Sequence, residues 1–171
     1  MKAFKSIFLC GRTYAKGVEI PWHKVYPMFF MHMLVFGVLG FGMAYAEKRP
    51  PVIALYVHAA FAIVVYLAFY LNAFGPDAVK WMFINSALGL MGIYSQIDWI
   101  LSLFGKQAGD YPFYVHLVPF LYYVIYTFLL QNAILDLTRS RENPGRRKLV
   151  EFGYVAASLT IYTIFYCLQR Q

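Results

Sequence analysis

The sequence predicts an all-α integral membrane protein, a bundle of five transmembrane helices in a single membrane domain covering residues 1–171. The chain is 61% hydrophobic and 13% charged, whereas soluble domains are about 45–50% apolar and about 25% charged. Five apolar runs each approach the roughly 20 residues that a helix needs to cross a bilayer. A soluble chain of this length could not bury so much apolar surface, but lipid accommodates it.

Residues 1–20 precede the first apolar run and carry Lys2, Lys5, Arg12 and Lys16. These charges exclude a membrane span, so we expect an interfacial N-terminal segment. Phe4, Ile7 and Phe8 would lie on one helical face, which is typical of a short interfacial helix. An irregular tail is the alternative.

The predicted membrane helices cover approximately residues 25–46, 52–74, 79–104, 112–135 and 149–168. Proline, glycine and charged residues separate them, as in Gly75-Pro76-Asp77 and Asn143-Pro144-Gly145. Backbone hydrogen bonding in lipid permits only helices or a closed barrel. Runs of this length without two-residue alternation exclude the barrel. Ala44-Tyr45-Ala46 resembles a signal-peptidase site, but the long charged leader and the spanning-length run favour a retained helix.

Lysine and arginine counts predict the orientation, because cytoplasmic loops are enriched in both residues. Eleven lysines and arginines lie before the first apolar run, between the second and third runs, and between the fourth and fifth runs. The remaining four lie in the segments predicted on the opposite side of the membrane. The N-terminus is therefore expected in the cytoplasm and the C-terminus on the outer, periplasmic side. The localisation expected is the bacterial inner membrane, and the net charge of +7 is assigned to orientation instead of nucleic-acid binding.

Three polar side chains from three predicted helices lie at one depth near the outer boundary. At about 1.5 Å per residue, His58, Asp98 and His116 all lie within roughly 6–10 Å of that boundary. Polar groups are expensive in lipid, so each requires a partner or a role. We expect the three side chains to face one another inside the bundle.

Four interpretations of this cluster stay open. His58 and His116 could be the axial ligands of haem b, or they could join Asp98 in a metal site. The cluster could also hold a quinone or a lipid headgroup by hydrogen bonds. Finally, the three side chains could pair only with one another and fix helix packing.

A second polar set is expected at the inner end, where amides bond between helices. It consists of Asn72, Asn85, Ser86, Gln131, Asn132 and Asp136. Small residues on the first and third helices, Gly37, Gly40, Ala44, Gly89 and Gly92, predict close helix approach.

The function predicted is that of an auxiliary, non-catalytic subunit of a larger inner-membrane complex of the respiratory or photosynthetic type. Its expected partners are other membrane protein subunits and lipid. Phosphate-binding loops and metalloprotease, c-type haem and serine-hydrolase motifs are absent, and Cys10 and Cys167 form no CxxC pair. The alternative is a small b-type cytochrome, or another electron-transfer protein that binds a quinone or a metal.

Overall fold

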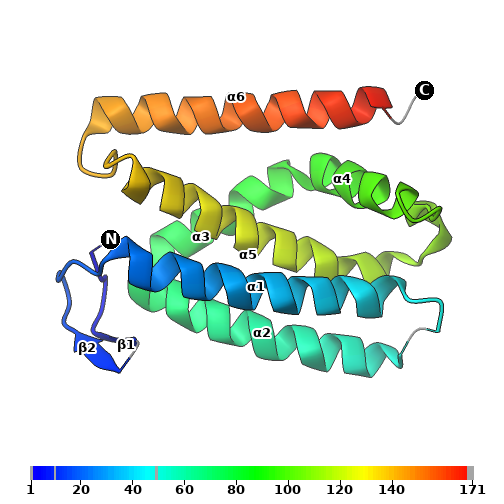
Figure 1. Ribbon diagram of the computed structural model, residues 1–171, viewed down its shortest axis with the longest axis horizontal. Helices are drawn as coiled ribbons and strands as arrows, with labels where there is room; N and C mark the ends of the chain where they lie inside the picture. The colour runs from blue at the N-terminus through cyan, green and yellow to red at the C-terminus, as the bar shows by residue number, and fades with distance from the viewer. Residues whose placement is uncertain (1, 10, 49, 169–171) are drawn as a thin grey trace.

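The computed structural model describes residues 2–9, 11–48 and 50–168 of the chain. Cys10, Arg49 and Arg170, which entered the sequence predictions, lie outside these ranges. The described chain is mostly helical, with one short hairpin at its beginning (Figure 1). The helices run as α1 (Trp22–Tyr45), α2 (Val52–Ala73), α3 (Pro76–Leu88), α4 (Leu90–Ser102), α5 (Phe113–Leu137) and α6 (Pro144–Leu168), with the 3-10 turn η1 (Ala108–Asp110) before α5.

Of the described helices, three are long and apolar enough to cross a membrane: α1, α2 and α5. This finding indicates a membrane protein and agrees with three of the five predicted spans. α6 has the length of a span, but Arg146, Arg147, Lys148 and Glu151 lie in its first two turns. The predicted third span is divided at Gly89 into α3 and α4, which together run from one end of the molecule to the other (Figure 1).

The N-terminal segment forms a hairpin, where the sequence predicted a short helix or an irregular tail. β1 (Ile7–Leu9) pairs antiparallel with β2 (Arg12–Tyr14). Ile7 and Leu9 are buried while Phe8 between them is exposed, which is the two-residue alternation of a strand. Gly11 has φ +75°, a conformation that glycine adopts without steric cost.

The N-terminal segment covers the end of α2. The amides of Phe4 and Lys5 donate to the carbonyls of Ala73 and Asn72, at 3.2 and 2.9 Å. The last carbonyls of a helix have no partner within it, so this contact satisfies two of them. Gly75 follows at φ +90°, and a Cβ there would lie 2.9 Å from the Phe4 ring. Glycine therefore allows both the turn after α2 and the close packing of Phe4.

The core lies between α1, α2 and α5. α1 and α2 stack Phe29 on Phe69, with ring centroids 3.8 Å apart. The Tyr70 hydroxyl of α2 is buried and donates to the Ile125 carbonyl of α5 at 2.9 Å. Gly40 of α1 faces the Tyr122 ring of α5, which confirms the close approach predicted at Gly40.

α6 lies outside this core, on the side of α4 and α5 away from α1 and α2 (Figure 1). Among its described side chains none is fully buried. The half-buried positions Val150, Glu151, Tyr154 and Ser158 recur at helical spacing. α6 therefore presents one narrow face to the bundle and leaves the rest of its surface exposed.

Candidate functional site

His116 lies at the centre of the end of the bundle where α1 ends and α5 begins. It is 6% exposed, and the rings of Tyr45, Tyr94 and Tyr111 surround it with centroids 5.7 to 6.4 Å away. Tyr45 is the last residue of α1, and Tyr111 belongs to the loop before α5. Three separate parts of the chain therefore meet at this imidazole.

Both ring nitrogens of His116 are hydrogen-bonded within the chain. Nε2 lies 3.1 Å from the Ala108 carbonyl oxygen, and Nδ1 lies 2.8 Å from the Tyr45 hydroxyl. A carbonyl only accepts, so Nε2 carries a proton. In the neutral imidazole Nδ1 then accepts from Tyr45. His116 thus joins the end of α1 to the loop that leads into α5.

Asp98 of α4 binds the same loop from its other side. Its Oδ1 accepts from the Ala108 amide at 2.6 Å, so Asp98 and His116 hold the two polar groups of one residue. Lys106 adds a bond from its Nζ to the Tyr45 carbonyl at 2.7 Å. The α4–α5 loop is therefore fastened to α1, α4 and α5 by charged and ring side chains.

His58 is directed elsewhere. It is half-buried on α2, and its Nε2 lies 3.3 Å from the Phe36 carbonyl of α1. Its ring packs on Phe36 and on Tyr122, at centroid distances of 5.3 and 6.3 Å. The structure brings His116 and Asp98 together around Ala108, while the described bond of His58 goes to α1.

The hydrogen bonds of His116 affect whether it could be a ligand of haem b or of a metal ion. An axial haem ligand needs a free imidazole lone pair, but Nε2 of His116 carries a proton and Nδ1 is bonded to Tyr45. Among the described residues, no group of three His, Cys, Asp or Glu side chains is placed to hold a metal ion. A shared site of His58, His116 and Asp98 stays a prediction.

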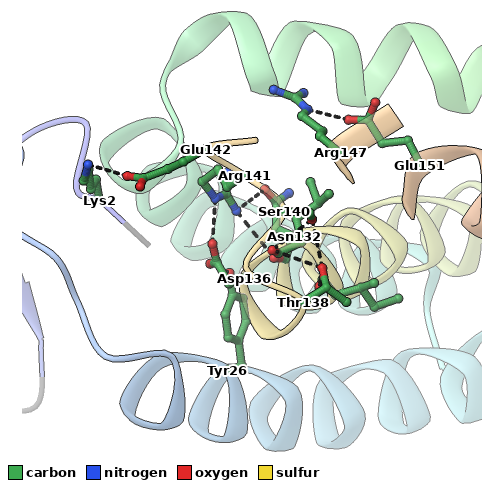
Figure 2. A network of polar contacts seen from close by, with 12 residues as sticks. Lys2, Tyr26, Asn132, Asp136, Thr138, Ser140, Arg141, Glu142, Arg147 and Glu151 are labelled. Atoms are coloured by element: carbon green, nitrogen blue, oxygen red, sulfur yellow. Dashed lines mark hydrogen bonds and ion pairs between the residues drawn. The ribbon is translucent and has the colours of Figure 1, made fainter. Parts of the chain in front are cut away.

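A polar network lies at the opposite end, where α5 turns toward α6 (Figure 2). Arg141 donates from Nε to Asp136 at 2.6 Å and from a terminal nitrogen to the Asn132 side chain at 3.0 Å. The Tyr26 hydroxyl of α1 donates to the second oxygen of Asp136. The Asp136 side chain is 6% exposed, so this carboxylate links α1 to the end of α5 in a nearly dry environment.

The turn that follows α5 brings Arg141 back to its own helix. Arg139 has φ 50°, and the amides of Arg139 and Ser140 donate to the carbonyls of Asp136 and Leu135, at 3.1 and 3.0 Å. This is the Schellman pattern, which usually has glycine at the left-handed position. The fully buried Ser140 hydroxyl bonds to the Leu135 carbonyl. The chain reverses sharply, and Arg141 then lies over Asn132 and Asp136.

The sequence identified Asn132 and Asp136 but missed Tyr26 and Arg141. Asn132 and Asp136 are one helical turn apart, but Arg141 reaches them only because of the left-handed turn. Three residues of the predicted inner set, Asn72, Ser86 and Asn132, donate to carbonyls one turn earlier in their own helices. The contact to α1 is therefore made by Tyr26 and Asp136 instead of by an amide bridge.

A cavity of about 770 Å³ lies beside this network, between α6 and the helices α3, α4 and α5. α5 and the loop after it contribute Gln131 and Arg141, α3 contributes Trp81 and Asn85, and α6 contributes Arg147. The volume falls in the range of about 300–1,000 Å³ typical of ligand sites. This cavity was not predicted from the sequence, because it depends on how far α6 lies from its neighbours.

The fold and these sites define a helical membrane protein with a polar cluster at each end of its core. Comparison with protein-family models, with curated proteins and with solved structures finds no match for this chain.

Proposed function

We propose that this protein is a non-catalytic, multi-pass subunit of a larger complex in a bacterial inner membrane. The observation that carries the proposal is the engagement of His116, whose two ring nitrogens both bond within the chain. The imidazole joins α1 to the α4–α5 loop through these two bonds. The most prominent candidate for chemistry in the sequence is thus used to hold the bundle together.

The exposed surface supports assembly with other membrane helices. On α6, Gly153 and Ala157 are exposed one turn apart, and a Cβ at Gly153 would meet nothing within 4 Å. Small residues at this spacing allow another helix to approach closely in lipid. Leu149 and Phe152 nearby on the same helix are 71% and 72% exposed, which suits lipid or a partner helix.

The topology proposed has five spans, with the N-terminus in the cytoplasm and the C-terminus in the periplasm. It is supported by the eleven-to-four distribution of lysine and arginine. The hairpin and the α5–α6 turn lie at one end of the molecule, and α6 ends at the other (Figure 1). α3 and α4 would serve together as one crossing that is broken at Gly89, as glycine is tolerated in membrane helices.

Native gel electrophoresis of membranes in mild detergent tests the proposal. We expect the wild-type protein to migrate in an assembly larger than the monomer and Gly153→Ile to migrate lower, because the larger side chain blocks close approach. Gly42→Ile is the matched control, since Gly42 is also exposed with open space around it on α1. Migration of the wild-type protein as a monomer would contradict a subunit role.

A reduced-minus-oxidised absorbance spectrum of the purified protein tests the absence of redox chemistry in the same proposal. We expect no haem α-band. A sharp α-band that disappears in His116→Gln would show that His116 is a haem ligand, and the non-catalytic assignment would then be wrong.

A further inference from the structure

We propose that the cavity between α6 and α3–α5 binds an anionic phospholipid, with the phosphate at Arg141 and Arg147 and an acyl chain along the apolar wall. This site is separate from the His116 cluster and does not depend on the subunit role. It is assigned from the volume of the cavity, from its charge and from the polar groups that line it.

The arginines give one part of the cavity a positive charge. Arg141 and Arg147 line it together with a single acidic side chain, Glu151. Arg147 bonds to Glu151 through Nε alone, at 2.7 Å, so its two terminal nitrogens have no partner among the described residues. Arg141 uses Nε and one terminal nitrogen within the chain. Terminal guanidinium nitrogens of this kind bind phosphate oxygens with charge-assisted bonds.

Two amide side chains continue the polar lining. Asn85 of α3 and Gln131 of α5 line the cavity, and their side-chain amides have no hydrogen bond to the residues described. The ester carbonyls of a phospholipid lie next to its phosphate and accept hydrogen bonds, so they match these donors.

Much of the remaining wall is apolar. It includes Ile93 of α4, Val124 of α5 and Val155 and Leu159 of α6. A polar part followed by an apolar wall matches an amphiphile, and acyl chains are the surrounding solvent of a membrane bundle.

Fluorescence quenching of Trp81, which lines the cavity, tests the proposal. Trp22→Phe and Trp99→Phe leave Trp81 as the sole tryptophan in the full chain, reconstituted in phosphatidylcholine vesicles. Phosphatidylglycerol brominated near the head of its acyl chain is then compared with brominated phosphatidylcholine at the same mole fraction. We expect the anionic lipid to bind about fivefold more strongly than phosphatidylcholine. This is the effect expected when one lysine or arginine lies near an anionic lipid.

Arg147→Gln should reduce this preference toward that for phosphatidylcholine. Arg146→Gln is the matched control, because Arg146 is adjacent, carries the same charge and does not line the cavity; the preference should persist. Arg141→Gln adds a second test, although Arg141 also holds Asp136 and its loss could unfold the protein. The Arg147 variant avoids that difficulty.

Three results would overturn the proposal. Equal quenching by the two brominated lipids would show that the cavity does not select an anionic lipid. Equal losses in Arg147→Gln and Arg146→Gln would show a general surface charge effect. Removal of the preference by inorganic phosphate alone would show a site for the free anion.

Discussion

Ala108 is held at both of its backbone polar groups, one by His116 and one by Asp98. Buried polar groups that lose a partner incur a desolvation cost, so the two side chains fix the path of the α4–α5 loop. The same two bonds give the polar side chains of His116 and Asp98 partners within the chain.

We expect His116→Ala to lower the free energy of unfolding by about 1–3 kcal/mol, because the Ala108 carbonyl and the Tyr45 hydroxyl lose a partner. The measurement is thermal or denaturant unfolding of the detergent-solubilised protein. His32→Ala is the control, since His32 is exposed and its side-chain hydrogen bond among the described residues goes to the Met28 carbonyl of its own helix. Equal stability of His116→Ala and wild type would contradict the structural role of His116.

Gly40 and Gly37 offer a matched test of helix packing on α1. A Cβ at position 40 would lie 2.4 Å from Cε2 of Tyr122, whereas a Cβ at position 37 would meet nothing within 4 Å. Gly40→Ala should therefore destabilise the protein by about 1–3 kcal/mol, the usual effect of overpacking, and Gly37→Ala should not. Unfolding curves for the two variants decide the matter, and equal shifts would refute this packing of α1 on α5.

At the scale of the elements, α5 is the central helix of the molecule. It contacts α1 at both ends, through Tyr45 and His116 at one and through Tyr26 and Asp136 at the other. Polar contacts at the two ends fix both the position and the rotation of α1 on α5.

The pair of Asp136 and Arg141 is expected to behave as a buried ion pair. Removing one partner of such a pair costs about 3–5 kcal/mol, while replacing both can be nearly neutral. We therefore expect Asp136→Asn to be strongly destabilising and the double variant with Arg141→Gln to recover part of the loss. A double-mutant cycle on the free energy of unfolding measures this coupling, and additive effects would show that the pair does not interact.

The N-terminal segment is joined to the α5–α6 turn by an exposed ion pair between Lys2 and Glu142 (Figure 2). Its hydrogen bond and charge raise the pKa of Lys2 and lower the pKa of Glu142. Because the pKa of Glu142 is lowered on folding, its contribution to stability is present at pH values above the pKa of the unfolded state. This contribution is lost as the pH falls through the pKa of the folded state. The contribution of Lys2 is lost as pH rises through its raised pKa.

Protection of the Lys5 amide from hydrogen exchange, corrected for intrinsic exchange, should therefore be highest at pH values between the pKa of Glu142 and that of Lys2. It should decrease as the pH falls through the pKa of Glu142. Lys5 is a suitable probe because its amide bonds to the Asn72 carbonyl. Glu142→Gln should remove this decrease in protection at low pH, while Glu47→Gln, at the opposite end of α1, should leave it unchanged. An identical decrease in Glu142→Gln would contradict a role for the pair.

At the scale of the whole molecule, the spans α1, α2 and α5 were predictable because their apolar runs are long and lack charged residues. The break at Gly89 was not, since glycine occurs both in continuous and in divided membrane helices. The hairpin was missed because Ile7 and Leu9 fit a strand while Phe4, Ile7 and Phe8 fit a helix. The pairing of the segment with the end of α2 distinguishes the two, and that is a tertiary contact.

For the candidate site, the sequence predicted a common depth for three residues, but it could not predict the direction in which each side chain points. The rise per residue placed His58, Asp98 and His116 near one level, but the direction of each side chain depends on how its helix is turned. Packing turns His58 toward Phe36 and His116 toward Ala108. The cavity beside α6 had no signal in the sequence, because it arises from the gap between elements.

The accessibility of single cysteines in intact inverted and right-side-out membrane vesicles tests the proposed five-span topology most directly. Three variants each keep a single cysteine. Two carry an introduced cysteine: Asn143→Cys in the α5–α6 turn and Gly109→Cys in the α4–α5 loop. The third keeps the native Cys167 near the end of α6. We expect an impermeant maleimide to label position 143 from the cytoplasmic side and positions 109 and 167 from the periplasmic side. Labelling of positions 143 and 167 from the same side would show that α6 does not cross the membrane and would contradict the five-span topology.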